Sequence, residues 1–334
     1  MVEGLRPALR RLRQAHGPVP AAVRAHWRDG PHLLVGLDLP ASADAEAAWA
    51  MLVADVQDWL RCTPAAPPIN AARHARTSAL LAEAEGIEYR PAPLRPDRTV
   101  ELGDQALPAP LGVPALAAHR DAFKADTLDD VFALIADRLA APARAMVDYA
   151  FRICCLHRLA WRDGLVLWPL SLRGQARYSA HAHPGSAERF DAMTSRLAPH
   201  LVARIDRERL FDVDASTLGP TAGWIARLQR GYDGLLAFND AAGPAFFRDL
   251  RASMPLPPAE HVARYDLTPS RTRDLMSHPT HFAYRLLVNL LYEMLSTVGF
   301  PAARRFFLCH LVTAVLEQHY PAVMTQARRA GAAL

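Results

Sequence analysis

Hydrogen-bonding residues recur along one face of an otherwise apolar segment near the C-terminus, HFAYRLLVNLLYEMLSTV from His281 to Val298. In a helix, positions i, i+4, i+8, i+11 and i+15 of this segment form one stripe. The stripe consists of His281, Arg285, Asn289, Tyr292 and Ser296. A helix face in water usually carries Glu, Asp and Lys instead. The stripe is therefore predicted to face a partly desolvated cleft, and a buried polar network that only fixes helix packing is the alternative.

A second group of such residues follows the apolar run GLVLWPLSLRG (Gly164 to Gly174), which is predicted to be a strand. Ser171, Arg173 and Gln175 alternate, so they share one face if the strand continues, and Tyr178 follows. Hydroxyl, guanidinium, amide and phenol groups together can bind an amide-rich ligand and move protons. The alternative is a strand end that frays into a polar loop.

The sequence lacks the residue patterns that metal sites and nucleotide-binding sites need. The pairs His181-x-His183 and His278-x-x-His281 bring imidazoles close in sequence, but nothing completes a set of three or four zinc ligands. The sequence has no Gly-rich phosphate loop, no dinucleotide fingerprint and no Gly-x-Ser-x-Gly elbow. No metal and no nucleotide cofactor are expected.

Cys154 and His157 are i, i+3 neighbours on a predicted helix and could form a thiol–imidazole pair. The surrounding FRICCLHRLAW is typical of a buried helix face, where cysteine acts as a small hydrophobic residue. We expect His157 to line the pocket instead. The four cysteines show neither a disulfide framework nor a Cys-x-x-Cys zinc motif, which favours a reducing compartment.

The elements that must position these groups predict an α+β fold, in which a small mixed sheet and helix part packs on a mainly helical part. Residues 1–334 are expected to form a single catalytic domain, with an α+β subdomain at 1–115 and a mainly helical subdomain carrying the active-site cavity at 116–334. In the first part the sequence predicts a strand at His32–Pro40, helices at about Asp44–Leu60 (N-cap Ser42) and Ala71–Glu85, and two short strands around Arg95–Arg98. The second part has predicted helices that begin with Thr127 and continue at about Ala143–Trp161, Ser186–Arg207, Thr221–Leu236, Pro244–Ser253, Thr280–Val298 and Pro301–His319.

Composition limits the classes of partner. With 334 residues and 51% hydrophobic content the chain can bury a large core. A net charge of +4 favours an acidic partner such as a carboxylate-rich peptide but is too weak to indicate nucleic acid. The basic start lacks the apolar region of a signal peptide, and no apolar run is long enough to span a bilayer. A cytoplasmic protein without membrane or nucleic-acid partners is expected.

Four stretches, read in their order along the chain, carry a family resemblance. They are GPHLLVGLDLP, EYRPAPLRPDRTVEL, LSLRGQARYSAH and HFAYRLLVNLLYEMLSTVGFPAARRFFLCHLV. Together they resemble the C-terminal glutamate-elimination domain of lantibiotic dehydratases and its stand-alone relatives in thiopeptide biosynthesis. The resemblance covers most of the chain and implies a lantibiotic-dehydratase elimination-domain-like fold.

Two activities share that fold. Elimination domains resemble each other in a His-Leu-Arg-Leu-Arg type strand whose arginines serve the glutamyl carboxylate, whereas this chain has Leu34 and Gly36 at those positions. A carboxylate leaving group needs a cationic clamp, so the departure disfavours elimination. The resemblance then implies a thiopeptide pyridine synthase. Such an enzyme joins two dehydroalanines of a leader-bearing thiazolyl peptide by formal [4+2] aza-cycloaddition, without a cofactor. Loss of water and of the leader-peptide amide then forms the central pyridine and the macrocycle.

For that reaction we expect Tyr178, His157, Tyr292 and Ser171 to be catalytic. The expected substrate-binding residues are Arg173, Gln175, His281, Tyr284, Arg285 and Asn289. The implied partner is a precursor peptide with an acidic leader and a modified core, and other thiopeptide enzymes are possible partners. The leader is expected to dock in the α+β subdomain, at the strand edge from His32 to Leu39 or at the linker after it. Three alternatives stay open: a glutamate-elimination component that uses other arginines such as Arg10, Arg11 and Arg13, a non-catalytic leader-binding partner, and an unrelated helical binding protein.

Overall fold

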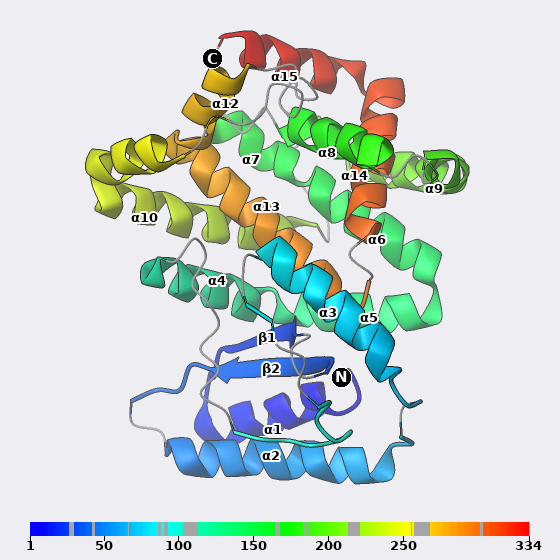
Figure 1. Cartoon of the computed structure of the whole chain (residues 1–334), viewed down its shortest axis with the longest axis vertical. Helices are drawn as coiled ribbons and strands as arrows, with labels where there is room; N and C mark the ends of the chain where they lie inside the picture. Colours follow the sequence, from blue (N-terminus) through cyan, green and yellow to red (C-terminus); the bar gives the residue numbers. More distant parts are fainter. Residues whose placement is uncertain are drawn as a thin grey trace. The chain divides into compact units, whose positions relative to one another are not determined.

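A computed structural model describes residues 1–26, 30–41, 44–65, 67–85, 88–89, 93–102, 113–163, 168–182, 185, 187–212, 221–254, 256, 268–300 and 303–333. Across these residues the chain is mainly helical with a two-stranded antiparallel sheet near its start, so the predicted α+β class is confirmed (Figure 1). The chain divides into two compact units. Unit 1 comprises Met1–Pro108 and Lys124–Phe132, and unit 2 comprises Ala109–Phe123 and Ala133–Leu334.

Unit 1 is built on a β-hairpin covered by helices. Strands β1 (Ala21–His26) and β2 (His32–Leu37) pair in the register Ala21↔Leu37 to His26↔His32. Figure 1 shows α1 (Leu5–His16) between this hairpin and α2 (Ala45–Cys62). Apolar residues of α1, β1 and α2, together with Leu128 and Phe132 of unit 1, form its core. The strand predicted at His32–Pro40 and the helix predicted at Asp44–Leu60 are confirmed, while β1 and α1 were missed.

Two local predictions in unit 1 need correction. Ser42 lies outside the described residues, and the N-cap of α2 is Asp44, whose carboxylate accepts from the Ala47 amide at 3.0 Å. The chain around Arg95–Arg98 forms a turn, but no strand flanks it in the described segments 88–89 and 93–102. Prolines at 91, 93 and 96 lack the N–H that a ladder requires, which explains the missing strands. Helix α3 (Ala71–Glu85) was predicted.

Unit 2 consists of packed helices, and several of the predicted ones are confirmed within a few residues. The predicted helix at Ala143–Trp161 is divided at Cys155, and a kink at Gly243 (φ +70°) separates the two predicted segments inside α10. The helices, of which α4 and α5 belong partly to unit 1, are α4 (Pro114–Asp126), α5 (Leu128–Ala140), α6 (Pro142–Cys154), α7 (Leu156–Asp163), α8 (Trp168–Ala182), α9 (Ala187–Arg207), α10 (Ala222–Ser253), α12 (Pro269–Met276), α13 (Pro279–Val298), α14 (Ala303–His319) and α15 (Pro321–Ala333).

The strand predicted at Gly164–Gly174 is wrong, because its described part is the start of helix α8. Pro169 falls in the first turn, where its missing N–H costs nothing, and Trp168 and Leu172 are buried one turn apart. Because side chains repeat every 3.6 residues in a helix and every two in a strand, the polar residues fall on different faces than predicted. Ser171 and Gln175, at i and i+4, share a helix face, whereas Arg173 points about 200° away from Ser171.

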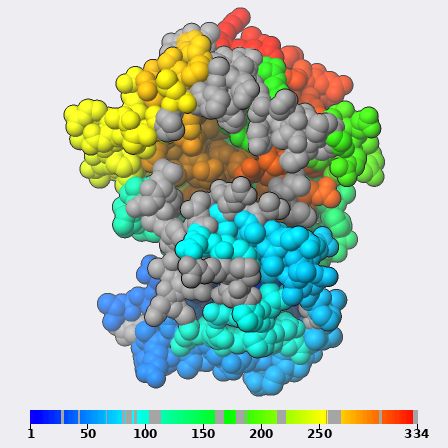
Figure 2. All heavy atoms as spheres, in the orientation of Figure 1, coloured from blue at the N-terminus to red at the C-terminus, as the bar shows by residue number. Residues whose placement is uncertain are grey.

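Helix α13 is enclosed on most of its circumference, as its apolar sequence predicts. Pro279 opens it, and Gly299 closes it in the left-handed conformation (φ +87°), where a residue without Cβ is favoured. The side-chain amide of Asn239 on α10 donates to the Pro279 carbonyl at 2.7 Å and fixes this start. Figure 2 shows atoms of α13 (orange) at the surface of unit 2 between those of α10 (yellow) and of α9 (green).

Candidate functional site

The stripe on α13 changes in burial along the helix. His281, Arg285 and Tyr292 are half-buried, while Asn289 and Ser296 are exposed. The Ser296 hydroxyl donates to the Glu293 carbonyl of the same helix at 2.8 Å, so its donor already has a partner. The predicted desolvated environment therefore applies to part of the stripe only.

Tyr284 and Ser171 come together from two helices. Tyr284, on α13 next to the stripe, is 2% exposed, and its hydroxyl forms no hydrogen bond of normal geometry with another described residue. The half-buried Ser171 of α8 lies near enough to affect its phenol. Burial raises the pKa of Tyr284 above its ordinary value, and the Ser171 side chain partly opposes that rise. A neutral phenol next to a hydroxyl can donate or accept a proton, which is the chemistry expected of a general acid–base site.

Tyr292 is held by two residues of α14. Its hydroxyl lies 3.3 Å from the Sγ of buried Cys309, and the guanidinium carbon of Arg305 lies 5.3 Å from the centre of its ring. Burial raises the pKa of Tyr292 well above its ordinary value, with smaller contributions from Cys309 and Tyr284, while Arg305 opposes the rise. Cys309 lies in a strongly apolar segment and was not predicted as a site residue, so this contact was missed.

His281 is an uncharged neighbour of Tyr284. The two ring centres are 5.6 Å apart. Burial, together with smaller contributions from the charges of Arg285 and His278, lowers the pKa of His281 to about 3. His281 is therefore neutral at pH 7 and can accept a hydrogen bond from a ligand without carrying a charge.

The other predicted site residues have different surroundings. His157 of α7 packs edge-on against Phe211 at 4.8 Å and Trp168 at 6.4 Å, and burial, helped by Arg158, lowers its pKa to about 4. Arg173 is buried with its guanidinium 4.0 Å from Glu317 of α14. Gln175 is half-buried on α8. Tyr178 belongs to α8, but its side chain lies outside the described residues.

A cavity of about 240 Å³ occurs elsewhere in unit 2, and no predicted site residue lines it. Its aromatic walls, Phe211 and Tyr320, meet edge-on at 4.8 Å, and the Tyr320 hydroxyl donates to Asp206 at 2.6 Å. The lining residues are Ile205, Asp206, Arg209, Leu210, Phe211, Asp212 and Tyr320. Its acids already have partners, since Asp206 accepts from Tyr320 and Asp212 pairs with Arg209.

In the part of the chain that the structure describes, no three His, Cys, Asp or Glu side chains come together in a group that could hold a metal ion. The cysteines are free thiols, and Cys62 is the exposed one among them. No helix within the described ranges is both long enough and apolar enough to cross a membrane.

Comparison with solved structures gives a match over nearly the whole chain. No protein-family model matches the chain, and no curated protein matches it either. A solved structure described as "Pyridine synthase, TbtD, from thiomuracin biosynthesis" superposes with a TM-score of 0.63 at 23% sequence identity. The match covers 96% of this chain and 94% of that chain. This chain therefore has the fold of that pyridine synthase. Both units are included in the likeness, which the diffuse sequence motifs alone could not establish.

Proposed function

We propose that this protein is a thiopeptide pyridine synthase. Its substrate would be a thiazolyl peptide that carries two dehydroalanines and still bears its leader peptide. The observation that carries the proposal is the likeness to the thiomuracin pyridine synthase over nearly the full length of both chains. The reaction is a formal [4+2] aza-cycloaddition followed by loss of water and of the leader as an amide.

The described site suits a reaction that depends on proximity and proton transfer. Two alkenes of one peptide must meet, and holding them together converts a rare encounter into a unimolecular step. Phenol, hydroxyl and neutral imidazole groups can then favour the iminol tautomer of one amide and protonate each leaving group. Tyr284, Ser171, Tyr292 and His281 supply these groups from α8 and α13.

Within this proposal the roles differ from residue to residue. Tyr284 and Ser171 exchange protons with the reacting amide, and Tyr292 protonates a leaving group. His281, Arg285, Gln175 and Asn289 orient backbone amides of the peptide. His157 acts by packing, because an imidazole with a pKa of about 4 between aromatic rings is neutral and enclosed. Arg173 orients α8 through Glu317.

Glutamate elimination receives less support. Its arginine positions correspond to Leu34 and Gly36 of β2, and neither residue offers a cationic group to a carboxylate. Arg11, one of the alternative cations, pairs with Asp55 at 2.7 Å. Arg13 donates to the Val19 carbonyl at 3.1 Å. Both arginines therefore have structural partners in unit 1.

The charge distribution favours unit 2 as the surface for an acidic leader. Unit 2 contains 25 Lys and Arg against 18 Asp and Glu, whereas unit 1 contains 13 against 16. The other edge of β2, where the sequence suggested docking, pairs with no further strand among the described residues and could accept an extended segment through backbone hydrogen bonds. An electrostatic contact weakens as salt is added, so a leader affinity that falls with ionic strength would support unit 2.

The direct test is mass spectrometry of the purified protein incubated with a dehydroalanine-containing thiazolyl peptide that retains its leader. We expect a leader-derived amide and a core product lighter by the leader and one water. If that peptide stays intact, a glutamylated precursor is tried next, and release of glutamate would identify an elimination enzyme. Leader binding without either product would indicate a non-catalytic partner, and no binding would contradict the proposal altogether.

A further inference from the structure

The contact between Tyr292 and Cys309 pairs a phenol with a thiol in a largely desolvated place. Burial raises the pKa of Cys309 to about 11, so its thiol is protonated at pH 7. Tyr292 is neutral for the same reason. Two neutral groups 3.3 Å apart can therefore share one hydrogen bond, in which either can donate. When the Cys309 thiol donates, the Tyr292 oxygen accepts and the phenol proton is left for a ligand.

Arg305 adds a charge to this pair. Its guanidinium lies over the rings of both Tyr292 (5.3 Å) and Phe306 (4.9 Å). Among the described residues no carboxylate forms an ion pair with Arg305. A cation over a phenol ring is attracted to its face and stabilises a phenolate more strongly than the neutral ring. Arg305 thus favours the state that Tyr292 reaches when its proton leaves.

We propose that Cys309 and Arg305 are positioning residues for Tyr292, the thiol aiming its hydroxyl at the substrate and the guanidinium stabilising the transient phenolate. In this step the O–H bond of Tyr292 breaks and the proton goes to the departing group of the substrate. The bond between the ring and that group breaks, and the phenolate beside Arg305 takes up the proton that the ring loses as it becomes aromatic. The inference rests on the proposed function for the identity of the proton acceptor.

The kinetic test compares Arg305 with its neighbour on the same helix. Arg304 contacts Met193 of α9 at 3.4 Å and serves as the matched control. Arg305→Met is expected to lower kcat about tenfold with KM changed less than about twofold, because the lost interaction develops in the transition state. Arg305→Lys should recover part of the loss. Arg304→Met should leave kcat unchanged, and an unchanged kcat in Arg305→Met would overturn the role of Arg305.

Cys309 is tested in the same way against another buried cysteine. Cys309→Ala removes the partner of Tyr292, whereas Cys309→Ser keeps a donor and acceptor, so Ser should retain more of kcat than Ala. Cys154→Ala, an equally buried thiol on α6, controls for packing. In a Tyr292→Phe background Cys309→Ala should have no further effect on kcat, because the thiol acts through the missing hydroxyl. Equal losses in both backgrounds would overturn the role of Cys309.

A second readout separates this inference from the proposed activity. Protein labelled with ¹³C at the ζ carbon of tyrosine gives one signal for each ring, and Tyr292→Phe assigns the relevant one. Cys309→Ala and Arg305→Met should both shift that signal, while Arg304→Met should not. A shift without any turnover in the parent protein would contradict the proposed function and support the positioning. An unshifted signal in both variants would overturn the positioning whatever the activity.

Discussion

The Ser171 hydroxyl of α8 lies beside the Tyr284 phenol of α13, although the two residues are far apart in sequence. Burial of Tyr284 keeps its phenol protonated, and its hydroxyl forms no hydrogen bond of normal geometry with another described residue. A pair of hydroxyls in this situation can pass a proton between a ligand and the protein without carrying a net charge.

Removal of either hydroxyl should slow the proposed reaction. We expect Tyr284→Phe and Ser171→Ala each to lower kcat about a hundredfold, since a positioned acid or base contributes that much. The double variant should lose little more than either single one, because the pair acts as a unit. Turnover is followed by mass spectrometry, with leader binding measured in parallel.

Tyr320→Phe is the matched control for this prediction. Its hydroxyl donates to Asp206 at 2.6 Å, at the cavity that no predicted site residue lines. The variant loses a phenol hydroxyl of the same kind but should turn over at the parental rate. If Tyr320→Phe and Tyr284→Phe lose the same fraction of kcat, Tyr284 has no special role in the chemistry.

The lowered pKa of His157 predicts how the free energy of unfolding depends on pH. Its pKa of about 4 in the folded protein lies below the ordinary value of 6.5, so the unfolded chain binds more protons between these two values. The free energy of unfolding should therefore fall as pH decreases below about 6.5, by about 2 kcal/mol from this residue at pH 5. His281, whose pKa is about 3, adds to the same trend.

His157→Phe isolates that contribution. The substitution keeps a ring against Phe211 and Trp168 and removes the titrating group. Urea unfolding at pH 7 and pH 5 should show a smaller difference between the two pH values for the variant than for the parent protein. An equal difference would mean that His157 is already protonated in the folded state or remains accessible to solvent.

The sequence predicted the elements whose pattern is long and periodic. Helix α13 has enough apolar residues, a proline at its start and a glycine just after its end, so its limits were predicted nearly to the residue. Helix α8 was missed because Ser171, Arg173 and Gln175 alternate like the face of a strand, and a short apolar run preceded them. Local pattern could not decide between the two periods there. In the folded protein Trp168 and Leu172 are both buried, one helical turn apart. That burial comes from neighbouring helices, so it cannot be read from the local pattern.

For the candidate site, the sequence predicted residue types but not the contacts between helices. The sequence identified Tyr292, Tyr284 and Ser171 by side-chain chemistry, but which of them meet depends on the packing of α8, α13 and α14. Cys309 and Arg305 carried no visible signal, because a cysteine in an apolar helix is usually a core residue and arginine is abundant in this chain. Contacts between residues on different helices cannot be read from the spacing within one helix.

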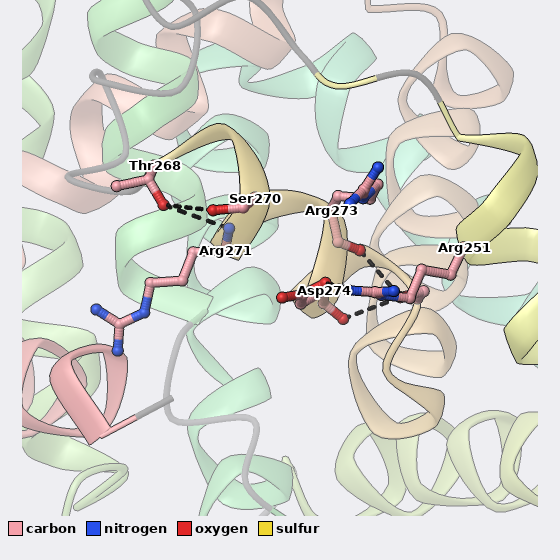
Figure 3. Close-up of polar contacts among 7 residues, drawn as sticks. Arg251, Thr268, Ser270, Arg271, Arg273 and Asp274 are labelled. Atoms are coloured by element: carbon pink, nitrogen blue, oxygen red, sulfur yellow. Dashed lines mark hydrogen bonds and ion pairs between the residues drawn. The ribbon is translucent and has the colours of Figure 1, made fainter.

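Asp148 provides the last prediction, on stability. It is 8% exposed on α6, accepts a hydrogen bond from Arg152 at 2.9 Å and forms an ion pair with Arg204 of α9 at 2.5 Å. Asp148→Asn leaves two partly buried cations without their carboxylate and should lower the free energy of unfolding by about 3 kcal/mol. The control is Asp274 of α12, which pairs with Arg251 of α10 at 2.7 Å while both side chains are 52% exposed (Figure 3). Asp274→Asn should cost less than about 1 kcal/mol, because water and salt screen an exposed pair. Urea unfolding of both variants distinguishes these cases, and equal losses would show that burial of Asp148 does not strengthen its ion pairs.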